Sequence, residues 1–593
     1  MGKMIKIGGA SGYWGESALA TPQLLTESEL DYLVYDYLAE ITMSIMARAK
    51  AKDAKRGYAT DFIDLVLKPH LNAIANKGVK IISNAGGVNP EACAKAAREL
   101  IKKQGLALKV AVITGDDRMD TLGDGHATDM FSRAPMPAKE TIASANLYLG
   151  AFPIAKALSE GADIIITGRC VDSAVTLGAC IHEFGWHNQD WDKLASGSLA
   201  GHILECGPQA TGGNFTDWKK AGDIANIGYP IAAIHADGSF IVTKPKNTEG
   251  IVNVGTVSEQ MLYEIGDPQN YILPDVVCDF SNVKIEEIAP NTVRVSPAKG
   301  RPATNSYKTC LTYHDGFRAG TYLSLYGEQA TLKAESLSAA IFKRAEQKLS
   351  QLNLEPFTEI SQEIIGGGSQ LGTRIEANEV ILKVAAKHSE AKAIGLFLKE
   401  VAGMGLATPP GLSGFTGAGR ARPSPVVRLF SYLTQKSDVE ITIEVAGKSF
   451  QYRDKVYSNP DKANIISPPS PVMDSSHLVT LKSLAWARSG DKGDKANIGI
   501  IARKAEYLPY IWHAMTTDFI SKSYAHFMSE TSKIERFYLP GANAMNILIN
   551  AVLGGGGAAS LRNDAQAKGY SQILLSKQIA VSPAIAETFK ARI

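Results

Sequence analysis

Short apolar runs alternate with longer amphipathic segments in the first half of the chain. The apolar runs cover residues 4–8, 79–84, 109–115 and 162–168, and each ends in Gly or Asn. The segments between them carry apolar residues at helical spacing, over residues 27–52, 60–77, 89–105 and 171–185. Near-continuous apolar strands that alternate with helices are typical of a parallel sheet covered on both faces. The pattern therefore predicts an α/β fold with a mostly parallel, doubly wound sheet.

The pattern changes after about residue 225, where the apolar runs become shorter and alternate with polar residues. Residues 291–300 and 439–447 are examples. Alternation with a period of two is typical of strands with one solvated face. We therefore predict a large unit over residues 1–455 that contains two lobes, 1–225 and 226–455, of which the second is of mixed α+β type.

The last part of the chain reads as a separate small unit. Residues 456–476 are rich in Pro and Ser, which favour neither a helix nor a central strand, so they predict a linker. Residues 477–593 then show a strand, a charged segment, a strand and helices, followed by a strand, a helix over 543–553 and a final strand. This order predicts a ferredoxin-like α+β domain.

Polar residues and glycines gather directly after the four strands predicted in the first lobe. In doubly wound sheets, ligands bind beyond the carboxyl ends of the strands, so these turns hold the first candidates for a site. The candidates are Gly9, Ser11, Gly12, Trp14, Glu16, Asn84, Gly86, Gly87, Asp116, Asp117, Arg169, Asp172 and Ser173. Arg169 is the main candidate for anion recognition, because a guanidinium group offers a planar fork to carboxylate or phosphate.

The first of these turns, GGASGYWGES at residues 8–17, carries three glycines at regular spacing after a strand. Backbone N–H groups in such a turn could hold phosphate or carboxylate. Pro22 interrupts the segment in which a phosphate-binding helix would continue, and the next predicted strand begins only at residue 79. We therefore do not expect, about 20 residues after the turn, the acidic side chain that binds the ribose in dinucleotide-binding folds. An anion other than a dinucleotide is therefore favoured, and nucleotide binding and a purely structural turn remain alternatives.

Two further groups suggest acid–base or metal chemistry. Asp116, Asp117 and His126 could bind a divalent metal, although their spacing matches no metal signature, and a hydrogen-bonded acid–base loop is the alternative. Glu205 lies beside Cys206, and a cysteine beside a carboxylate could be a nucleophile or a general acid–base group; an inert buried cysteine is the alternative. The same segment adds a candidate ligand turn formed by Gly212, Gly213 and Asn214.

The charged segment WARSGDKGDKANIG at residues 486–499 lies between two apolar runs. A hairpin needs only two to five turn residues, few of them charged. Arg488, Asp491 and Lys492 therefore indicate a segment that reaches into a site or an interface.

Composition and charge narrow the classes of partner. The chain has 593 residues, with 62 basic and 60 acidic side chains and a net charge of +2, so bulk charge favours neither a nucleic-acid nor a membrane partner. Its six cysteines show no CxxC spacing, which indicates reduced thiols. The sequence has neither the apolar region of a signal peptide nor a membrane-length apolar run, so we expect a cytoplasmic protein, with an organelle matrix as the alternative. The size and the small appended domain favour a homo-oligomer.

Taken together, the motifs GGASGYWGES, SNAGGVNP, ITGDD, ITGRCVDSA, ECGPQATGGNF and LAWARSGDKGDKANIG resemble the acyclic terpene utilisation family, AtuA, with its small ferredoxin-fold C-terminal domain. The resemblance covers essentially the whole chain. It implies an enzyme that breaks down branched acyl-CoA esters, and specifically a carbon–carbon lyase acting on a 3-hydroxy-3-branched glutaryl-CoA type of ester. It carries no established catalytic residues.

Cleavage of such an ester needs a base for the hydroxyl group and stabilisation of an enolate, for which Asp116, Asp117, Arg169 and Asp172 are candidates. Mg²⁺ or Mn²⁺ could serve as a Lewis acid, and no cofactor is certain. Two alternatives remain: a nucleotide-dependent enzyme that uses the glycine turn, and a non-catalytic scaffold or subunit that binds other catabolic enzymes.

Overall fold

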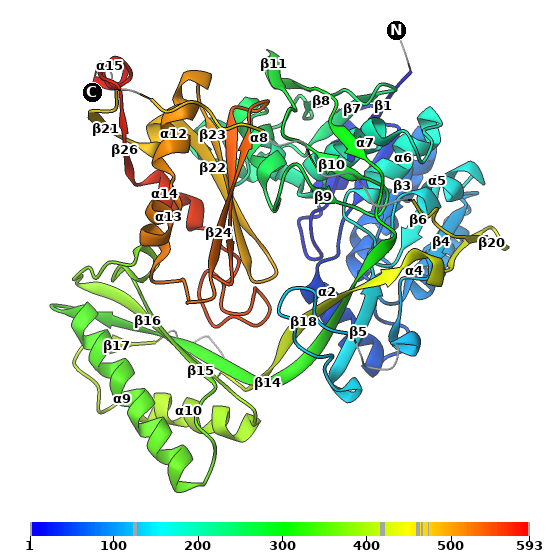
Figure 1. The fold of residues 1–593 in the computed structure, drawn as a ribbon. Coiled ribbons are helices and arrows are strands. Elements are labelled where there is room, and N and C mark those ends of the chain that lie inside the picture. The colour runs from blue at the N-terminus through cyan, green and yellow to red at the C-terminus, as the bar shows by residue number, and fades with distance from the viewer. Residues whose placement is uncertain are drawn as a thin grey trace.

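The computed structural model describes residues 3–122, 127–414, 421–457, 463, 466–472 and 474–590. Five parallel strands form the middle of its largest sheet: β1 (Met4–Gly9), β2 (Tyr32–Tyr35), β3 (Lys80–Ser83), β6 (Ile164–Thr167) and β4 (Val110–Thr114). Antiparallel strands extend the sheet on both sides: β7 (Ile231–His235), β8 (Phe240–Thr243), β12 (Thr292–Val295), β11 (Ile285–Ala289), β19 (Ile441–Val445) and β20 (Lys448–Tyr452). Within the described residues the order is β11-β12-β8-β7-β1-β2-β3-β6-β4-β19-β20 (Figure 1).

Helices cover both faces of this sheet, and each face has its own apolar core. One core includes side chains of α1 (Ala20–Glu27), α2 (Glu40–Lys52), α3 (Lys68–Lys77) and α4 (Pro90–Lys103). The other includes side chains of α5 (Phe152–Ser159), α6 (Ala174–Phe184) and α7 (Trp191–Glu205). The predicted doubly wound α/β sheet with a parallel centre is confirmed.

The two neighbouring strands β3 and β6 lead to helices on opposite faces. The chain passes from β3 into α4 on one face and from β6 into α6 on the other. Adjacent strands whose connections diverge in this way leave a crevice at their carboxyl ends, which is the usual ligand position in such sheets. The fold thus places the expected site after β3 and β6.

The helix expected over residues 27–52 is wrong in its first half. All four residues of β2 are buried between β1 and β3, and the helix α2 begins only at Glu40. A short apolar run such as Tyr-Leu-Val-Tyr fits helical spacing and a buried strand equally well, and burial on both faces decides for the strand. The second strand therefore follows the first after a short helix, and not at residue 79.

The large sheet also continues past residue 225, where a lobe boundary was expected. β7 pairs antiparallel with β1 and covers its free edge, which would otherwise expose unpaired backbone groups. Beyond this sheet, α8 (Val254–Leu262) and a small sheet of β9 (Tyr271–Ile272), β10 (Val277–Asp279) and β13 (Lys299–Arg301) pack near α7.

A second sheet, whose described pairings are all antiparallel, lies to one side of the first. The long strands β14 (Ser306–Tyr326) and β18 (Ser424–Gln435) run away from the large sheet toward β15 (Glu359–Ile365), β16 (Glu379–His388) and β17 (Leu412–Ser413) (Figure 1). Near the large sheet, β14 also pairs with β5 (Ile142–Leu147). The helices α9 (Ala330–Gln351) and α10 (Ala391–Gly403) pack on the distal part through a core of their own.

The C-terminal unit has a four-stranded antiparallel sheet in the order β22-β23-β25-β24, formed by β22 (Ala485–Lys492), β23 (Lys495–Ala502), β25 (Ala544–Asn550) and β24 (Lys533–Leu539). Its other elements are β21 (His477–Thr480), β26 (Gln578–Val581), α11 (Leu481–Leu484), α12 (Leu508–Ala514), α13 (Thr517–Tyr524), α14 (Tyr570–Leu575) and α15 (Pro583–Lys590). The predicted ferredoxin-like α+β class is confirmed. The helix expected over 543–553 is wrong, because β25 is a central strand whose residues are buried between two neighbours.

The helices in the described part of the chain are all too short or too polar to cross a membrane.

Candidate active site

Polar side chains meet after β2, β3 and β6. Asn84 follows β3 and donates a hydrogen bond from Nδ2 to the carboxylate of Asp36, which follows β2. Asn84 Oδ1 also accepts from the Tyr37 N–H at 2.8 Å. After β6, Arg169 Nη1 donates to the Leu38 carbonyl at 3.0 Å. Because Asp36 and Asn84 are both buried, these contacts fix the three strand ends relative to one another.

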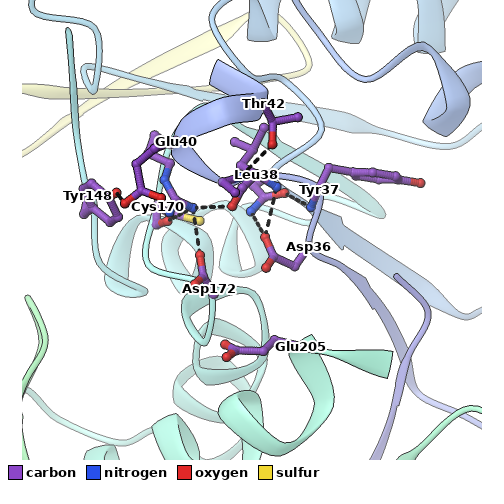
Figure 2. A network of polar contacts seen from close by, with 12 residues as sticks. Asp36, Tyr37, Leu38, Glu40, Thr42, Tyr148, Cys170, Asp172 and Glu205 are labelled. Atoms are coloured by element: carbon purple, nitrogen blue, oxygen red, sulfur yellow. Dashed lines mark hydrogen bonds and ion pairs between the residues drawn. The ribbon is translucent and has the colours of Figure 1, made fainter. Parts of the chain in front are cut away.

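Arg169 is held from several directions. Its Nη1 also contacts Asp172 Oδ1 at 2.7 Å and the Cys170 carbonyl at 3.2 Å, and its guanidinium group stacks 4.2 Å from the Tyr148 ring centre. The Arg169 side chain is 4% exposed, whereas Asp172 is 27% exposed. Arg169 is therefore an interior residue that holds Asp172, the more exposed partner, whose side chain carries a dashed contact in Figure 2.

Asp116 supports the same turn. Its Oδ2 accepts from the Arg169 N–H and from Asn146 Nδ2, each at 2.8 Å. Burial raises the pKa of Asp116 to about 7, although these two hydrogen bonds oppose the shift. The carboxylate lies so close to Gly168 that a Cβ there would be 2.3 Å from Asp116 Oδ1. Asp116 thus contributes to the site by positioning the backbone of Arg169.

The proposed metal group is not assembled by its two described members. Asp117 is exposed and caps the Met119 N–H at 2.9 Å, while Asp116 is buried. His126 lies outside the described residues. Among the residues that the structure does describe, no three His, Cys, Asp or Glu side chains form a group that could hold a metal ion.

Glu40, at the start of α2, brings a stable negative charge to the cluster. Its Oε1 accepts from the Tyr148 hydroxyl at 2.5 Å and lies 3.7 Å from Lys308 Nζ. Burial alone would raise the pKa of Glu40, but Lys308 and Arg169 outweigh burial and lower the pKa to about 2. Glu40 is therefore ionised at neutral pH.

The end of α7 supplies an acid–base pair. His202 Nδ1 lies 2.9 Å from Glu205 Oε1, and the two side chains are 2% and 10% exposed. Burial raises the pKa of Glu205 against the opposing effect of His202. Burial would lower the pKa of His202, but Glu205 outweighs it and raises the pKa. Both shifts favour retention of a proton by the pair, which is the property required of a general acid–base group.

Cys206 is less suited to chemistry than its neighbour. Burial and the adjacent Glu205 raise the pKa of the thiol well above its ordinary value. The thiolate, not the thiol, is the nucleophile, so this environment suppresses reactivity. The geometry favours Glu205 over Cys206 as the reactive group.

The glycine-rich turn after β1 packs against the end of α7. A Cβ at Gly9 would lie 2.5 Å from the Leu204 carbonyl oxygen, and one at Gly12 would lie 2.9 Å from that of Glu205. These glycines therefore let two segments of backbone approach closely and so fix the position of Glu205. The other residues predicted in this turn are also engaged: Ser11 hydrogen-bonds to the Asp36 carbonyl, and Trp14 packs against a core.

The turn holds a carboxylate of the protein itself. Glu16 Oε2 accepts from the Gly12 N–H at 2.5 Å, and Glu16 Oε1 accepts from the Tyr229 hydroxyl at 2.8 Å. Asp36 has the position after the second strand that a ribose-binding acid takes in dinucleotide-binding folds, but it is buried against Asn84. The Gly12 N–H and the Asp36 carboxylate are thus already engaged by groups of the chain itself.

The remaining predicted glycines also meet protein atoms. A Cβ at Gly86 would lie 2.4 Å from the Thr167 carbonyl oxygen, so Gly86 allows β3 and β6 to approach at their ends. A Cβ at Gly87 would contact Met46, one at Gly212 would contact Ala221, and one at Gly213 would contact Pro208. Ser173 packs against Gly201.

The charged segment of the C-terminal unit is a hairpin whose end reaches the cluster. β22 and β23 pair as far as Lys492 and Lys495, which leaves only Gly493 and Asp494 in the turn. Lys492 Nζ lies 3.7 Å from Glu264 Oε2. Desolvation would lower the pKa of Lys492, but Tyr271, Glu264, Asp172 and Glu40 raise it well above its ordinary value. The Lys492 side chain is 48% exposed, and its charge lies within electrostatic reach of these acidic groups.

Contacts between the two units hold this hairpin in place. Arg488 Nη1 donates to the Asn214 carbonyl at 3.0 Å, and Arg488 stacks 4.8 Å from the Tyr263 ring centre. Asp217 forms two 2.7 Å contacts with Arg503. Arg488 and Asn214, both predicted as ligand-binding, therefore join the units.

Asp491 is next to Lys568 and Gln566, and burial raises its pKa to about 6.

The structure gathers Asn84, Arg169, Asp172, Glu205 and Lys492 from the predicted set. Sequence reasoning missed five further members, namely Asp36, Glu40, Tyr148, His202 and Lys308. Two of them had a detectable pattern. His202 and Glu205 have the i, i+3 spacing that pairs side chains on a helix, and Asp36 directly follows a buried apolar run.

Comparison with protein-family models identifies the chain. The model described as "Acyclic terpene utilisation family protein AtuA" matches residues 5–445. The chain belongs to the AtuA family. A second model, the AtuA ferredoxin-like domain, matches residues 479–580. Neither a curated protein nor a solved structure gives a significant match. The cluster therefore combines strand-end residues of the AtuA match with Lys492 of the ferredoxin-like match.

Proposed function

We propose that this AtuA protein is an enzyme of acyclic terpene breakdown that cleaves a carbon–carbon bond in a 3-hydroxy-3-branched glutaryl-CoA type of ester. One observation supports the proposal: the buried acid–base pair of His202 and Glu205 in the large unit lies within electrostatic reach of Lys492, a cation of the C-terminal unit. The family match supports a role in terpene catabolism, and the acyl-CoA substrate and the lyase chemistry are our inference.

The reaction requires a base and a group that stabilises negative charge. In a retro-aldol cleavage, a base takes the proton of the 3-hydroxyl group, the oxygen lone pair forms a ketone, and the electrons of the broken carbon–carbon bond pass into an enolate. Glu205, with His202 behind it, takes the role of the base. Lys492 stabilises the enolate oxygen. The pair of Glu205 and His202 then returns the proton to the enolate carbon.

Mass spectrometry of products after incubation with a panel of acyl-CoA esters tests this proposal. The panel includes 3-hydroxy-3-branched glutaryl-CoA esters, straight-chain 3-hydroxyacyl-CoA esters and saturated acyl-CoA esters, each with and without Mg²⁺ or Mn²⁺. We expect a ketone and an enolate-derived product only from the 3-hydroxy-3-branched esters, because the same cleavage of a straight-chain 3-hydroxyacyl ester would give an aldehyde. Absence of cleavage for the whole panel, with or without metal, would refute the lyase.

Two alternatives are tested by separate measurements. Calorimetry with NAD(P) and ATP would detect a nucleotide-dependent enzyme. If no ester is bound or cleaved and a second catabolic enzyme co-purifies, the protein is a scaffold or subunit. A homo-oligomer remains our expectation, to be measured by light scattering.

A further inference from the structure

A cleft lies between the second sheet and the C-terminal unit. Its volume is about 700 Å³, which is within the usual range for small-molecule sites. One wall comes from the end of β15 and the glycine-rich segment after it, and the other from residues 557–569. None of the residues predicted from the sequence as site residues lines this cleft.

Apolar side chains lie exposed on one wall. Ile365, Leu371 and Ile375 line the cleft and are 37%, 43% and 43% exposed. Exposed apolar side chains that gather in a concave surface indicate a bound apolar group. A ligand with an apolar portion would therefore gain from burial at this wall.

The amide side chains of Gln370 and Gln566 provide polar groups in the cleft lining. Gln370 Nε2 donates to Asp564 Oδ2 at 3.1 Å, and Gln566 Nε2 donates to Asp491 Oδ1 at 3.3 Å. These contacts orient the two amides, and within the described part of the chain their Oε1 atoms accept no hydrogen bond. Both oxygens are acceptors for N–H groups of a ligand.

Side-chain contacts link one residue of the cleft lining to the proposed active site. Lys568 lines it, and Lys568 Nζ lies 3.8 Å from Glu264 Oε1. The other oxygen of the same carboxylate, Glu264 Oε2, lies 3.7 Å from Lys492 Nζ. One carboxylate thus separates the end of the cleft from the cation of the active site.

We propose that this cleft binds the pantetheine arm of a CoA thioester and directs the thioester toward Lys492. This inference rests on the proposed function for the identity of the substrate. Pantetheine is an extended chain with two amide groups and a branched gem-dimethyl group, so it matches both the amide acceptors and the apolar wall. Its sulfur end then lies toward Lys568 and Lys492.

Calorimetric titration with pantetheine itself tests the inference without any turnover. Ala565 lines the cleft, so Ala565→Trp fills it, and Gln566→Ala removes one acceptor with less risk to folding. The matched control is Gln362→Trp, at an exposed position of β15 outside the cleft lining. We expect both cleft variants to weaken pantetheine binding by about tenfold or more, and the control to bind like the wild type.

The inference is overturned if the wild type does not bind pantetheine, or if the cleft variants bind it as tightly as the control does. The result is separable from that of the lyase assay. Binding that depends on the cleft, with no cleavage of any ester, refutes only the lyase. Cleavage of CoA esters, with pantetheine binding that ignores the cleft variants, refutes only the cleft.

Discussion

Replacing Asp116 with Asn tests the structural reasoning at a single buried carboxylate. The substitution keeps the shape of the side chain, and the amide oxygen can still accept from the Arg169 N–H and from Asn146. Only the ionisation is removed. Any change in the pH dependence of stability therefore reports the charge of Asp116.

The magnitude follows from the raised pKa. Burial raises the pKa of Asp116 from 3.8 to about 7, so the folded state holds the proton more tightly than the unfolded state does. The stability due to this group is then fully present below pH 4 and is lost as the pH rises to about 7. At 1.36 kcal/mol per pKa unit, the whole loss is about 4 kcal/mol, of which about 3 kcal/mol falls between pH 5 and pH 8.

Urea unfolding at pH 5 and pH 8 measures this effect. We expect the stability of Asp116→Asn relative to the wild type to rise by about 3 kcal/mol between the two pH values. Asp117→Asn makes the same chemical change at the exposed neighbouring position and should leave the pH dependence nearly unchanged. Equal behaviour of the two variants would refute the assignment of Asp116 as a buried carboxyl group with a raised pKa.

Two further variants test how the acid–base pair is built and held. Glu205→Gln should lower kcat/KM about 100-fold or more and remove the acidic limb of the pH–rate profile, because the base is lost; an unchanged profile would exclude Glu205 as the base. Gly9→Ala should cost about 1–3 kcal/mol in urea unfolding, since its Cβ would meet the Leu204 carbonyl oxygen at 2.5 Å. Gly395→Ala is the control, because no atom lies within 4 Å of a Cβ there, and a similar loss in both variants would contradict the packing argument.

The parallel sheet was predictable because its signal is local. The strands at 4–9, 80–83, 110–114 and 164–167 are apolar runs that end at turn residues, and this pattern needs no knowledge of the tertiary structure. The strands β2 and β25 were missed for the opposite reason. Both are apolar runs compatible with helical spacing, and only their central position between two neighbouring strands selects the extended form.

Around the parallel sheet, the site was predictable where polar residues directly follow recognised strands. Asn84, Arg169 and Asp172 were found in this way, whereas Asp36 and Glu40 were hidden behind the missed strand β2. The role of the glycine turn depended on contacts distant in sequence, because the atoms next to Gly9 belong to residue 204. Sequence spacing alone does not distinguish a turn that admits a ligand from one that admits another segment of backbone.

The central claim is that the hairpin of the ferredoxin-like unit completes a site at the strand ends of the large sheet. The most direct test compares kcat/KM of the wild type, Lys492→Met and Lys495→Met on the ester that the product assay identifies. Lys495 lies in the same hairpin but stacks over Phe131, 5.0 Å from the ring centre, so it serves as the matched control. We predict a loss of about 100-fold or more for Lys492→Met and of no more than about twofold for Lys495→Met. Wild-type activity in Lys492→Met, or equal losses in both variants, would contradict the account.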